Sequence, residues 1–316
     1  MKFVFGPVRS RRLGRSLGVN NIPYKTCTYS CIYCQLGRTI NHTVTRRCFY
    51  NWKEIVDEVV GFLEKSKAGV DYVTFVPDGE PTLDACLGKM IEGIKREVDV
   101  KIAVLTNASL LWIEDVRNDL TEADYVSVKV DTVNERVWRE LNRPYRTLRL
   151  EDILNGIQEF SRKFNGVLVS ETMLVHGINT GRAYYEEIAR YLKNLRLYKT
   201  YISIPIRPPA EPYVELPKER EVIEAYEVFS RVIGGEKIEL LTSSEPPPDK
   251  VYGDPETWIL NTTSVHPLRY EHAVKILEKV CDNPKEVIER LVEKGLIVKI
   301  QYLGNSYLLR NFKKSI

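Results

Sequence analysis

The sequence predicts an α/β protein built around a mainly parallel β-sheet, with a smaller unit at its carboxyl end. Short runs of β-branched and aromatic residues alternate with stretches of about 10–15 residues whose apolar side chains recur at helical spacing. A Pro-rich stretch at residues 243–249 then separates this alternation from a different pattern. At 316 residues, the chain is long enough for one large and one small domain.

The alternation begins with a short strand at residues 16–23 and continues through six strand–helix units. Further strands are expected at 72–76, 101–106, 125–131, 167–175, 200–205 and 237–241, and helices at 52–65, 84–97, 112–121, 151–163, 181–195 and 218–233. A closed barrel needs eight units, so six predict a partial (β/α)6 barrel. An open doubly wound sheet is the alternative.

Residues 250–316 follow the Pro-rich linker and predict a second, small domain after a first one at 1–242. Helices are expected at 269–280 and 284–294, and strands at 296–302 and 306–310 would form a hairpin around Gly304 and Asn305. Helices followed by a hairpin resemble a winged helix, a shape that binds nucleic acid in some proteins and other proteins elsewhere.

Composition argues against several classes of protein. No run reaches the roughly 18 apolar residues of a membrane span, and the amino terminus lacks the apolar stretch of a signal peptide. We therefore expect a cytoplasmic protein with no membrane partner. Three of the six cysteines are clustered, which favours metal binding over a disulfide framework. Cys86 and Cys281 are expected to be buried as small hydrophobic side chains.

The most informative stretch carries Cys27, Cys31 and Cys34 within eight residues, at the spacing C-x3-C-x2-C. Three thiolates on one tight loop can hold three corners of an iron–sulfur cluster and leave the fourth corner open. A zinc site completed by His42 or Cys48 is the alternative. Zinc usually draws its four ligands from separated pairs, which favours the cluster.

Basic residues gather on both sides of this loop, and no Asp or Glu precedes Glu54. Eight cations flank the cysteines: Arg9, Arg11, Arg12, Arg15, Lys25, Arg38, Arg46 and Arg47. Such a bias suits an anionic substrate, for which Arg11 and Arg12 are candidate contacts; a basic surface is the alternative. Arg207, after the sixth strand, is a further candidate for an anion or else forms a surface ion pair.

The cysteine spacing, with Tyr33 before the third cysteine, resembles the signature of the radical S-adenosylmethionine (SAM) superfamily. The resemblance extends over residues 16–241 and implies a [4Fe-4S] cluster on Cys27, Cys31 and Cys34, with SAM on the open iron and Tyr33 beside its adenine. An electron from a flavodoxin- or ferredoxin-like donor would cleave SAM to a 5′-deoxyadenosyl radical, which abstracts hydrogen from the substrate.

Residues at the ends of the next two strands also match this superfamily. Asp78-Gly79-Glu80 is similar to the Gly-Gly-Glu motif that holds the methionine amino group, with Asp78 in place of the first Gly. An acidic residue at a helix start is the alternative for Glu80. Thr106 and Asn107 end the third strand, where superfamily members often have polar groups facing the cofactor.

Polar residues continue along the fourth and fifth strands. Ser127, Lys129 and Asp131 alternate and therefore share one face of the strand. Three polar side chains are costly to bury in a barrel without a ligand, and the resemblance places them near the ribose and carboxylate of SAM. A solvent-facing strand is the alternative. Glu171 on the fifth strand is a candidate contact for the ribose or the substrate.

A closer match lies in residues 6–14 and 20–23, which resemble an uncharacterised radical SAM group related to the wybutosine-synthesising tRNA enzymes. The additional upstream cysteines of those enzymes are missing, so their reaction does not transfer. We expect an anionic substrate, with tRNA as the first candidate and a small phosphorylated or carboxylated metabolite as the second. A zinc-stabilised nucleic-acid-binding protein is the non-enzymatic alternative. No feature of the sequence indicates an oligomeric state.

Overall fold

The computed structural model describes residues 2–66, 69–243, 246–248 and 250–312. An eight-stranded sheet with the order β1-β2-β5-β6-β7-β8-β9-β10 forms its centre. The strands are β1 Val4–Ser10, β2 Gly14–Val19, β5 Tyr72–Phe75, β6 Lys101–Thr106, β7 Tyr125–Lys129, β8 Val167–Met173, β9 Lys199–Ser203 and β10 Ile238–Leu241. From β2 to β10 every neighbouring pair is parallel, and only β1 pairs antiparallel, with β2.

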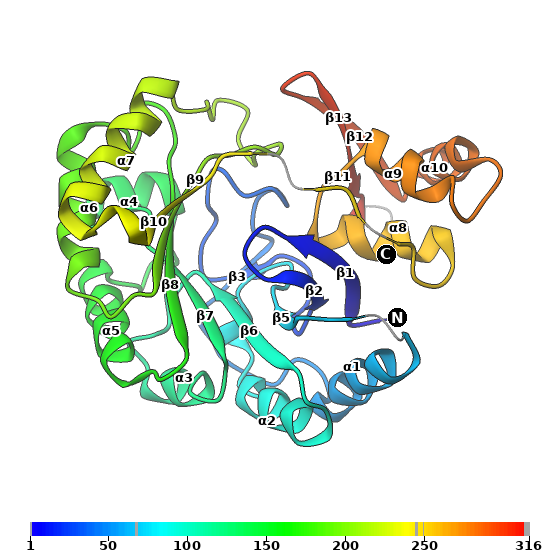
Figure 1. Ribbon diagram of the computed structural model, residues 1–316, viewed down its shortest axis with the longest axis horizontal. Coiled ribbons are helices and arrows are strands. Elements are labelled where there is room, and N and C mark those ends of the chain that lie inside the picture. Colours follow the sequence, from blue (N-terminus) through cyan, green and yellow to red (C-terminus); the bar gives the residue numbers. More distant parts are fainter. Residues whose placement is uncertain (1, 67–68, 244–245, 249, 313–316) are drawn as a thin grey trace.

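Helices follow the strands and cover the convex face of the curved sheet (Figure 1). They are α1 Trp52–Ser66, α2 Leu87–Glu97, α3 Glu114–Asp119, α4 Glu135–Asn142, α5 Leu150–Lys163, α6 Arg182–Lys193 and α7 Glu219–Ile233. Each amphipathic helix turns an apolar stripe to the sheet, as α2 does with Met90, Ile91 and Ile94. This arrangement confirms the predicted α/β architecture with a mostly parallel sheet.

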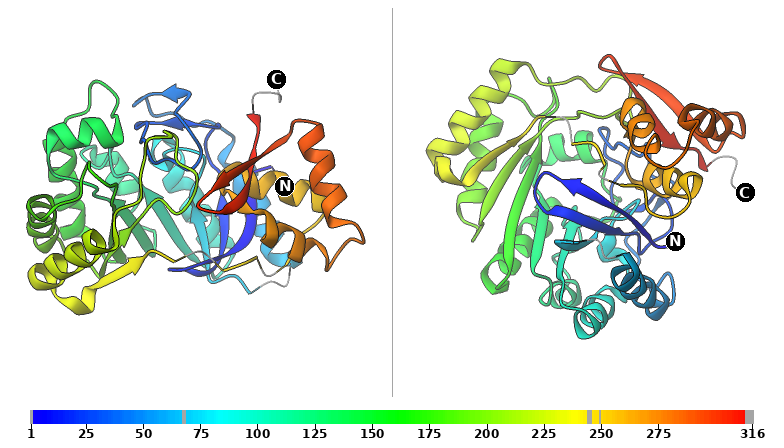
Figure 2. Two further views of the ribbon diagram at one scale, coloured as in Figure 1. Left: turned by 90° about the horizontal axis from the view of Figure 1, so that it is seen from above. Right: turned by 45° about the vertical axis from the view of Figure 1, so that its right-hand side comes forward.

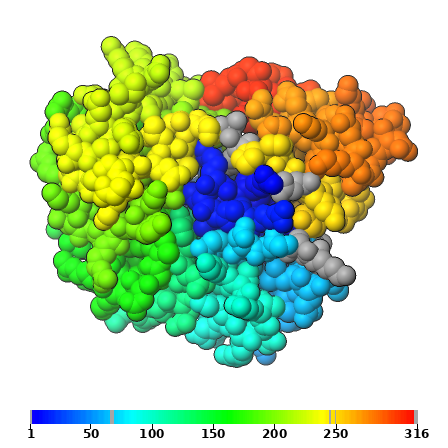
Figure 3. All heavy atoms as spheres, viewed as in Figure 1, coloured from blue at the N-terminus to red at the C-terminus, as the bar shows by residue number. Residues whose placement is uncertain are grey.

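The β1–β2 hairpin lies across the open side of the curved sheet (Figures 1 and 3). Leu13, at the tip of the hairpin, belongs to the same buried apolar cluster as Tyr125 of β7 and Tyr201 of β9. Gly18 of β2 is required for this hairpin, because a Cβ at that position would lie 2.0 Å from the ring of Phe5. The sequence did not predict β1, whose apolar run is interrupted by Gly6-Pro7.

The carboxyl-terminal segment forms its own apolar cluster around Trp258, Leu268 and Ile276. Its elements are α8 Pro255–Val265, β11 Leu268–Arg269, α9 Tyr270–Leu277, α10 Pro284–Glu293, β12 Ile297–Tyr302 and β13 Asn305–Arg310. The strands make a three-stranded sheet in the order β11-β13-β12. The predicted hairpin is present, and the winged-helix assignment stays a prediction.

Two helices escaped the sequence analysis for physical reasons. Helix α4 has only eight residues, and α8 contains the weak helix formers Asn261, Thr262 and Thr263, although Asp254 caps its first turn by accepting from Thr257 N at 2.8 Å. The proposed boundaries at 242 and 250 stay predictions, because residues 244, 245 and 249 lie outside the described residues, as do 313–316. No helix in the described part of the chain has the length and apolar character needed to cross a membrane.

The carboxyl-terminal segment lies beside one end of the large sheet (Figure 2), and two tyrosines connect the two parts. Tyr302 donates its hydroxyl hydrogen to Pro205 O at 2.7 Å, and Tyr307 donates to Ile206 O at 3.2 Å. Both acceptors follow β9 in the chain. These bonds hold the three-stranded sheet beside the carboxyl ends of the barrel strands.

Candidate active site

The cysteine loop leaves the carboxyl end of β2. Its first strand, β3 Thr26–Cys27, pairs in parallel with β4 Asn41–His42, which returns from the loop. Gly79, after β5, lies directly against this strand, because a Cβ there would come within 1.9 Å of Thr26 O. Glu80 N donates to the same carbonyl at 3.1 Å. The glycine therefore lets the end of β5 pass close to the cysteines.

Each of the three loop cysteines is a free thiol that accepts an N–H from a different side chain. Cys27 Sγ lies 3.6 Å from Asn107 Nδ2, Cys31 Sγ lies 3.5 Å from Asn142 Nδ2, and Cys34 Sγ lies 3.2 Å from Lys25 Nζ. The three donors come from different segments of the chain: Asn107 follows β6, Asn142 ends α4, and Lys25 belongs to the cysteine loop itself. Donors of this kind orient sulfur ligands and adjust the electronic properties of a bound metal.

The spacing of the three sulfurs bears on the choice between zinc and a cluster. Among the described residues, Cys48, Asp84 and Cys86 form a group of three possible ligand atoms that all lie within 4.8 Å of one another. The three loop sulfurs do not form such a group. One tetrahedral zinc with Zn–S bonds of about 2.3 Å needs sulfurs about 3.8 Å apart. The loop therefore fits the separate corners of an iron–sulfur cluster better than a single zinc ion.

The two proposed fourth zinc ligands are also engaged elsewhere. His42 Nε2 lies 2.9 Å from Thr28 O, and Cys48 forms a disulfide with Cys86. Cys86 is buried as expected, but it is bonded to Cys48, so the expectation that it is simply a small hydrophobic side chain is wrong. The disulfide forms because the backbone of Arg47 pairs with that of Asp84, which brings together two cysteines separated by 38 residues.

Glu80 joins the ends of β5 and β6 through its buried carboxylate. Oε1 accepts from Thr82 N at 3.1 Å, Thr82 Oγ1 at 2.6 Å and Thr106 Oγ1 at 2.5 Å, and Oε2 accepts from Asn107 N at 2.7 Å. Burial raises the pKa of Glu80 despite these donors. Glu80 also caps the 3₁₀ turn Pro81–Leu83. The alternative from the sequence, an acidic residue at the start of a helix, is therefore compatible with a place for Glu80 in the site.

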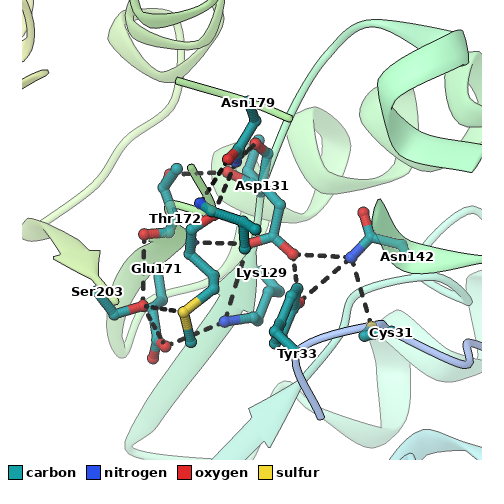
Figure 4. A network of polar contacts seen from close by, with 12 residues as sticks. Cys31, Tyr33, Lys129, Asp131, Asn142, Glu171, Thr172, Asn179 and Ser203 are labelled. Carbon is teal, nitrogen blue, oxygen red and sulfur yellow. Dashed lines mark hydrogen bonds and ion pairs between the residues drawn. The ribbon is translucent and has the colours of Figure 1, made fainter. Parts of the chain in front are cut away.

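A network of polar side chains continues from the cysteine loop into the barrel (Figure 4). Asp131 accepts from the Tyr33 hydroxyl, from Asn142 Nδ2 at 2.8 Å and from Met173 N at 2.8 Å. Lys129 Nζ lies 3.8 Å from Asp131 Oδ1 and 5.1 Å from the centre of the Tyr33 ring. The solvent-facing alternative for this strand is therefore wrong.

The network ends at Glu171, which meets two cations. Its Oε1 lies 3.1 Å from Lys129 Nζ and its Oε2 lies 2.6 Å from Arg12 Nη1. Burial alone would raise the pKa of Glu171, but the charges of Lys129 and Arg12 outweigh it and hold the pKa well below its usual value. Arg12 Nη1 also donates to Ser127 Oγ at 3.3 Å, and Ser203 Oγ donates to Glu171 Oε1 at 2.9 Å.

Two of the predicted substrate arginines have partners elsewhere in the chain. Arg11 Nη1 donates to Leu241 O and to Ser243 O, each at 2.8 Å, and so ties the β1–β2 loop to the end of β10. Arg207 donates to Gln35 Oε1, and its Nη2 lies 3.1 Å from His266 Nε2. Arg207 therefore connects the cysteine loop to the residue after α8.

The flanking cations separate in space. Lys25 and Arg38 stay beside the cysteine loop, whereas Arg46 pairs with Asp119 and Arg47 lies 4.9 Å from the ring centre of Phe49. The sequence analysis missed Lys25 as a sulfur partner, and it missed Asn142 and Ser203 entirely. It also missed the loop 143–149, which carries three arginines and packs on the cysteine loop through Tyr145 N and Thr28 O at 2.8 Å.

Comparison with known proteins identifies the class of enzyme that this site represents. The chain belongs to the radical SAM superfamily, because the family model described as Radical SAM superfamily matches residues 21–192, more than half of the chain. Within it, the chain is 44% identical over 316 residues to a UPF0026 protein of Methanocaldococcus jannaschii, covering 99% of this chain and 97% of that protein. It is therefore also a member of the UPF0026 family.

More distant comparisons agree on the fold. The chain is 23% identical over 208 residues to the probable dual-specificity RNA methyltransferase RlmN of Endomicrobium trichonymphae, covering 62% of this chain and 57% of that one. A crystal structure of a radical SAM methyltransferase from Sphaerobacter thermophilus matches with a TM-score of 0.54 at 16% identity, over 72% of this chain and 67% of the other. The protein is thus a radical SAM enzyme, with a [4Fe-4S] cluster and SAM as the cofactors of its superfamily.

Proposed function

We propose that Cys27, Cys31 and Cys34 are the cluster ligands and that the enzyme acts on an anionic substrate, with tRNA as the first candidate. The cluster and SAM together supply a 5′-deoxyadenosyl radical that abstracts hydrogen. The observation that carries the assignment is the set of three free thiols on one loop, each with its own N–H donor. Three protein ligands leave the fourth corner for SAM.

The chain's own residues would bind and orient SAM from two sides of the cysteine loop. The first side holds the methionine end: Gly79, Glu80, Thr106 and Asn107. The second side faces the ribose, the adenine and the substrate: Tyr33, Ser127, Lys129, Asp131 and Glu171. Asp131 is buried and Lys129 is half-buried next to Tyr33, and their charges are opposite, which suits the ribose hydroxyls and the SAM carboxylate, respectively.

Arginines on the rim of the cysteine loop support an anionic substrate. Arg38 donates to both oxygens of Glu211, from Nε to Oε1 and from Nη2 to Oε2, each at 2.8 Å. Arg143 also donates to Oε1, so one buried carboxylate binds two arginines. Arg38 and Arg149 both have 71% exposed side chains. A relative that is named as an RNA methyltransferase favours RNA as the source of the negative charge. Arg11, Arg12 and Arg207 remain weaker candidates for substrate contacts.

The carboxyl-terminal segment would assist in binding the substrate. Gln35 Nε2, one residue after Cys34, donates to Val265 O at the end of α8 at 3.2 Å. Any substrate that reaches the cysteine loop would therefore pass beside this segment. We also propose a flavodoxin- or ferredoxin-like electron donor as a partner, which the enzyme would meet in the cytoplasm.

Binding of bulk tRNA at several salt concentrations tests the substrate class. If phosphates are contacted, affinity falls steeply with added salt, with a slope of about −0.7 to −0.9 for each contact. Arg149→Gln should reduce that slope by about one contact, while Arg182→Gln, on the outer face of α6, should leave it unchanged. No binding at low salt would contradict tRNA and favour the small anionic metabolite.

A further inference from the structure

Lys25 holds an unusual place in the cysteine loop. Only 2% of the residue is exposed, and its φ of 53° lies in the left-handed region that side-chain-bearing residues seldom adopt. Its N–H donates to Asp78 O at 3.2 Å, and its carbonyl accepts from Ile40 N at 3.1 Å and Asn41 N at 3.0 Å. The backbone is thus fixed between the end of β5 and the return of the loop, which directs the side chain inward.

The buried ammonium points to Cys34. Its Nζ lies 3.2 Å from Cys34 Sγ, closer than the amide donors of Asn107 and Asn142 lie to their sulfurs, at 3.6 and 3.5 Å. The other two donors are neutral, whereas Lys25 brings a full charge. A buried charge is costly unless it is paired, so the sulfur and its surroundings must compensate for it.

Asp78 contributes to that compensation. It stands where related motifs have glycine, and it accepts from Asn20 Nδ2 at 2.9 Å. Burial raises the pKa of Asp78 to about 7, and the positive charge of Lys25 acts in the opposite direction. The carboxylate and the ammonium therefore attract one another, on the side of Lys25 that is anchored to the end of β5.

We propose that Lys25 is a positioning residue that raises the reduction potential of the cluster through its bond to Cys34. This inference rests on the proposed function, because it takes Cys34 as a cluster ligand. Reduction adds a negative charge to the cluster, and a nearby cation in a site of low dielectric stabilises that charge. The hydrogen bond to the ligand sulfur acts in the same direction.

The consequence for function is a cluster that accepts an electron more readily. Lys25 would bring the cluster potential closer to that of the electron donor, while Asn107 and Asn142 supply smaller effects of the same sign. This role differs from that of Glu80 or Asp131, since Lys25 would act on the cluster and not on SAM. Its effect should therefore be measurable without SAM or substrate.

The test is an EPR-monitored redox titration of the reconstituted full-length protein in the absence of SAM. The variants are Lys25→Met, Lys25→Gln and Lys25→Arg. Each has a side chain that is unbranched at Cβ, as lysine has, so the strain of the left-handed backbone at residue 25 is matched among them. We expect the midpoint potential to be most negative in Lys25→Met, intermediate in Lys25→Gln and close to the parent in Lys25→Arg. Lys163→Met, an exposed lysine at the end of α5, is the matched control and should not shift it.

Iron content and the visible absorption of each variant separate the possible outcomes. Equal midpoints in Lys25→Met and the parent, at equal iron content, would overturn the role of Lys25 and leave the proposed function intact. If Lys25→Met does not retain iron, the comparison of Lys25→Gln with the parent decides by the same criterion. A parent protein that binds no iron would instead overturn the proposed function itself.

Discussion

The two ends of the polar network inside the barrel differ in how their charges are balanced. At Glu171, one carboxylate faces Lys129 and Arg12 and also accepts from Ser203, so the chain's own residues complete the arrangement. At the cysteine loop, each sulfur accepts a hydrogen bond from the side-chain nitrogen of Asn107, Asn142 or Lys25, and the loop thiols themselves remain free to bind a metal. The charge of Glu171 is therefore balanced by the chain's own residues, whereas the loop sulfurs are available as metal ligands.

Asp131 lies between these two ends and contacts both. It accepts from Tyr33 and Asn142 of the cysteine side and lies 3.8 Å from Lys129 of the Glu171 side. The carboxylate of Asp131 therefore links the cysteine loop to the Glu171 end of the network. The following predictions alter each end in turn, beginning with the largest expected effect.

Removal of a cysteine should abolish activity. Cys34→Ala leaves two sulfurs on the loop, so we expect iron content and the formation of 5′-deoxyadenosine to fall to background. Iron analysis and chromatography of the reaction products measure both. Cys281→Ala, at a half-buried thiol near α9, is the control and should behave as the parent does. Parent-like iron content in Cys34→Ala would remove Cys34 from the ligand set.

Removal of the carboxylate at the other end should destabilise the fold. Glu171→Gln leaves Lys129 and Arg12 without their shared counter-ion, so the free energy of unfolding should fall by about 3–5 kcal/mol in a urea titration. Glu187→Gln, exposed on α6, should change it by less than about 0.5 kcal/mol.

The pH dependence of this effect has a defined sign. The pKa of Glu171 is lowered in the folded protein, so its stabilisation is complete above the unfolded pKa of about 4.3 and declines as the pH falls further. The gap between the parent and Glu171→Gln should therefore narrow below about pH 4. A constant gap at all pH values would mean that the charge of Glu171 is not the source of the stability.

Loss of the disulfide should have a smaller effect. Cys48→Ala opens a cross-link between residues 38 apart, which predicts a loss of about 3–4 kcal/mol in the free energy of unfolding. Reductant should lower the stability of the parent to the level of the variant and leave the variant unchanged. A parent that unfolds identically with and without reductant would show that the cross-link does not form in solution.

Asp84 should produce the smallest change, seen only in its pH dependence. Burial raises its pKa to about 7, so the stabilisation from Asp84 is present at low pH and is lost as the pH rises through that value. Asp84→Asn should make stability less dependent on pH between about 4 and 7. Asp152→Asn, exposed on α5, is the control and should show the parent's dependence of unfolding free energy on pH. If Asp84→Asn shows the same dependence, Asp84 is not its origin.

The sequence predicted the proximity of residues whose arrangement is local. The three cysteines share one loop, and Ser127 and Lys129 share one face of β7, so spacing alone places them together. Asp131 follows two residues after the end of that strand. Glu80 lies in the segment that follows β5, and Thr106 ends the neighbouring parallel strand β6; they meet because the carboxyl ends of parallel strands lie at one edge of a sheet.

The missed features depend on contacts between distant segments. Asn142 meets Cys31 across 111 residues, and Cys48 meets Cys86 only because a loop pairs with the segment after β5. The cations around the loop show the same limit, since Arg46 and Arg47 are near the cysteines in sequence but find partners elsewhere. Nothing in the local pattern of any of these segments distinguishes the true partner from the alternatives.

Reductive cleavage of SAM tests the central claim most directly. The parent protein, reconstituted anaerobically with iron and sulfide and then reduced, should be brown and should convert SAM to 5′-deoxyadenosine and methionine. The same preparation of Cys27→Ala, Cys31→Ala or Cys34→Ala should yield neither product. A colourless parent that holds one zinc ion and leaves SAM intact would contradict the account.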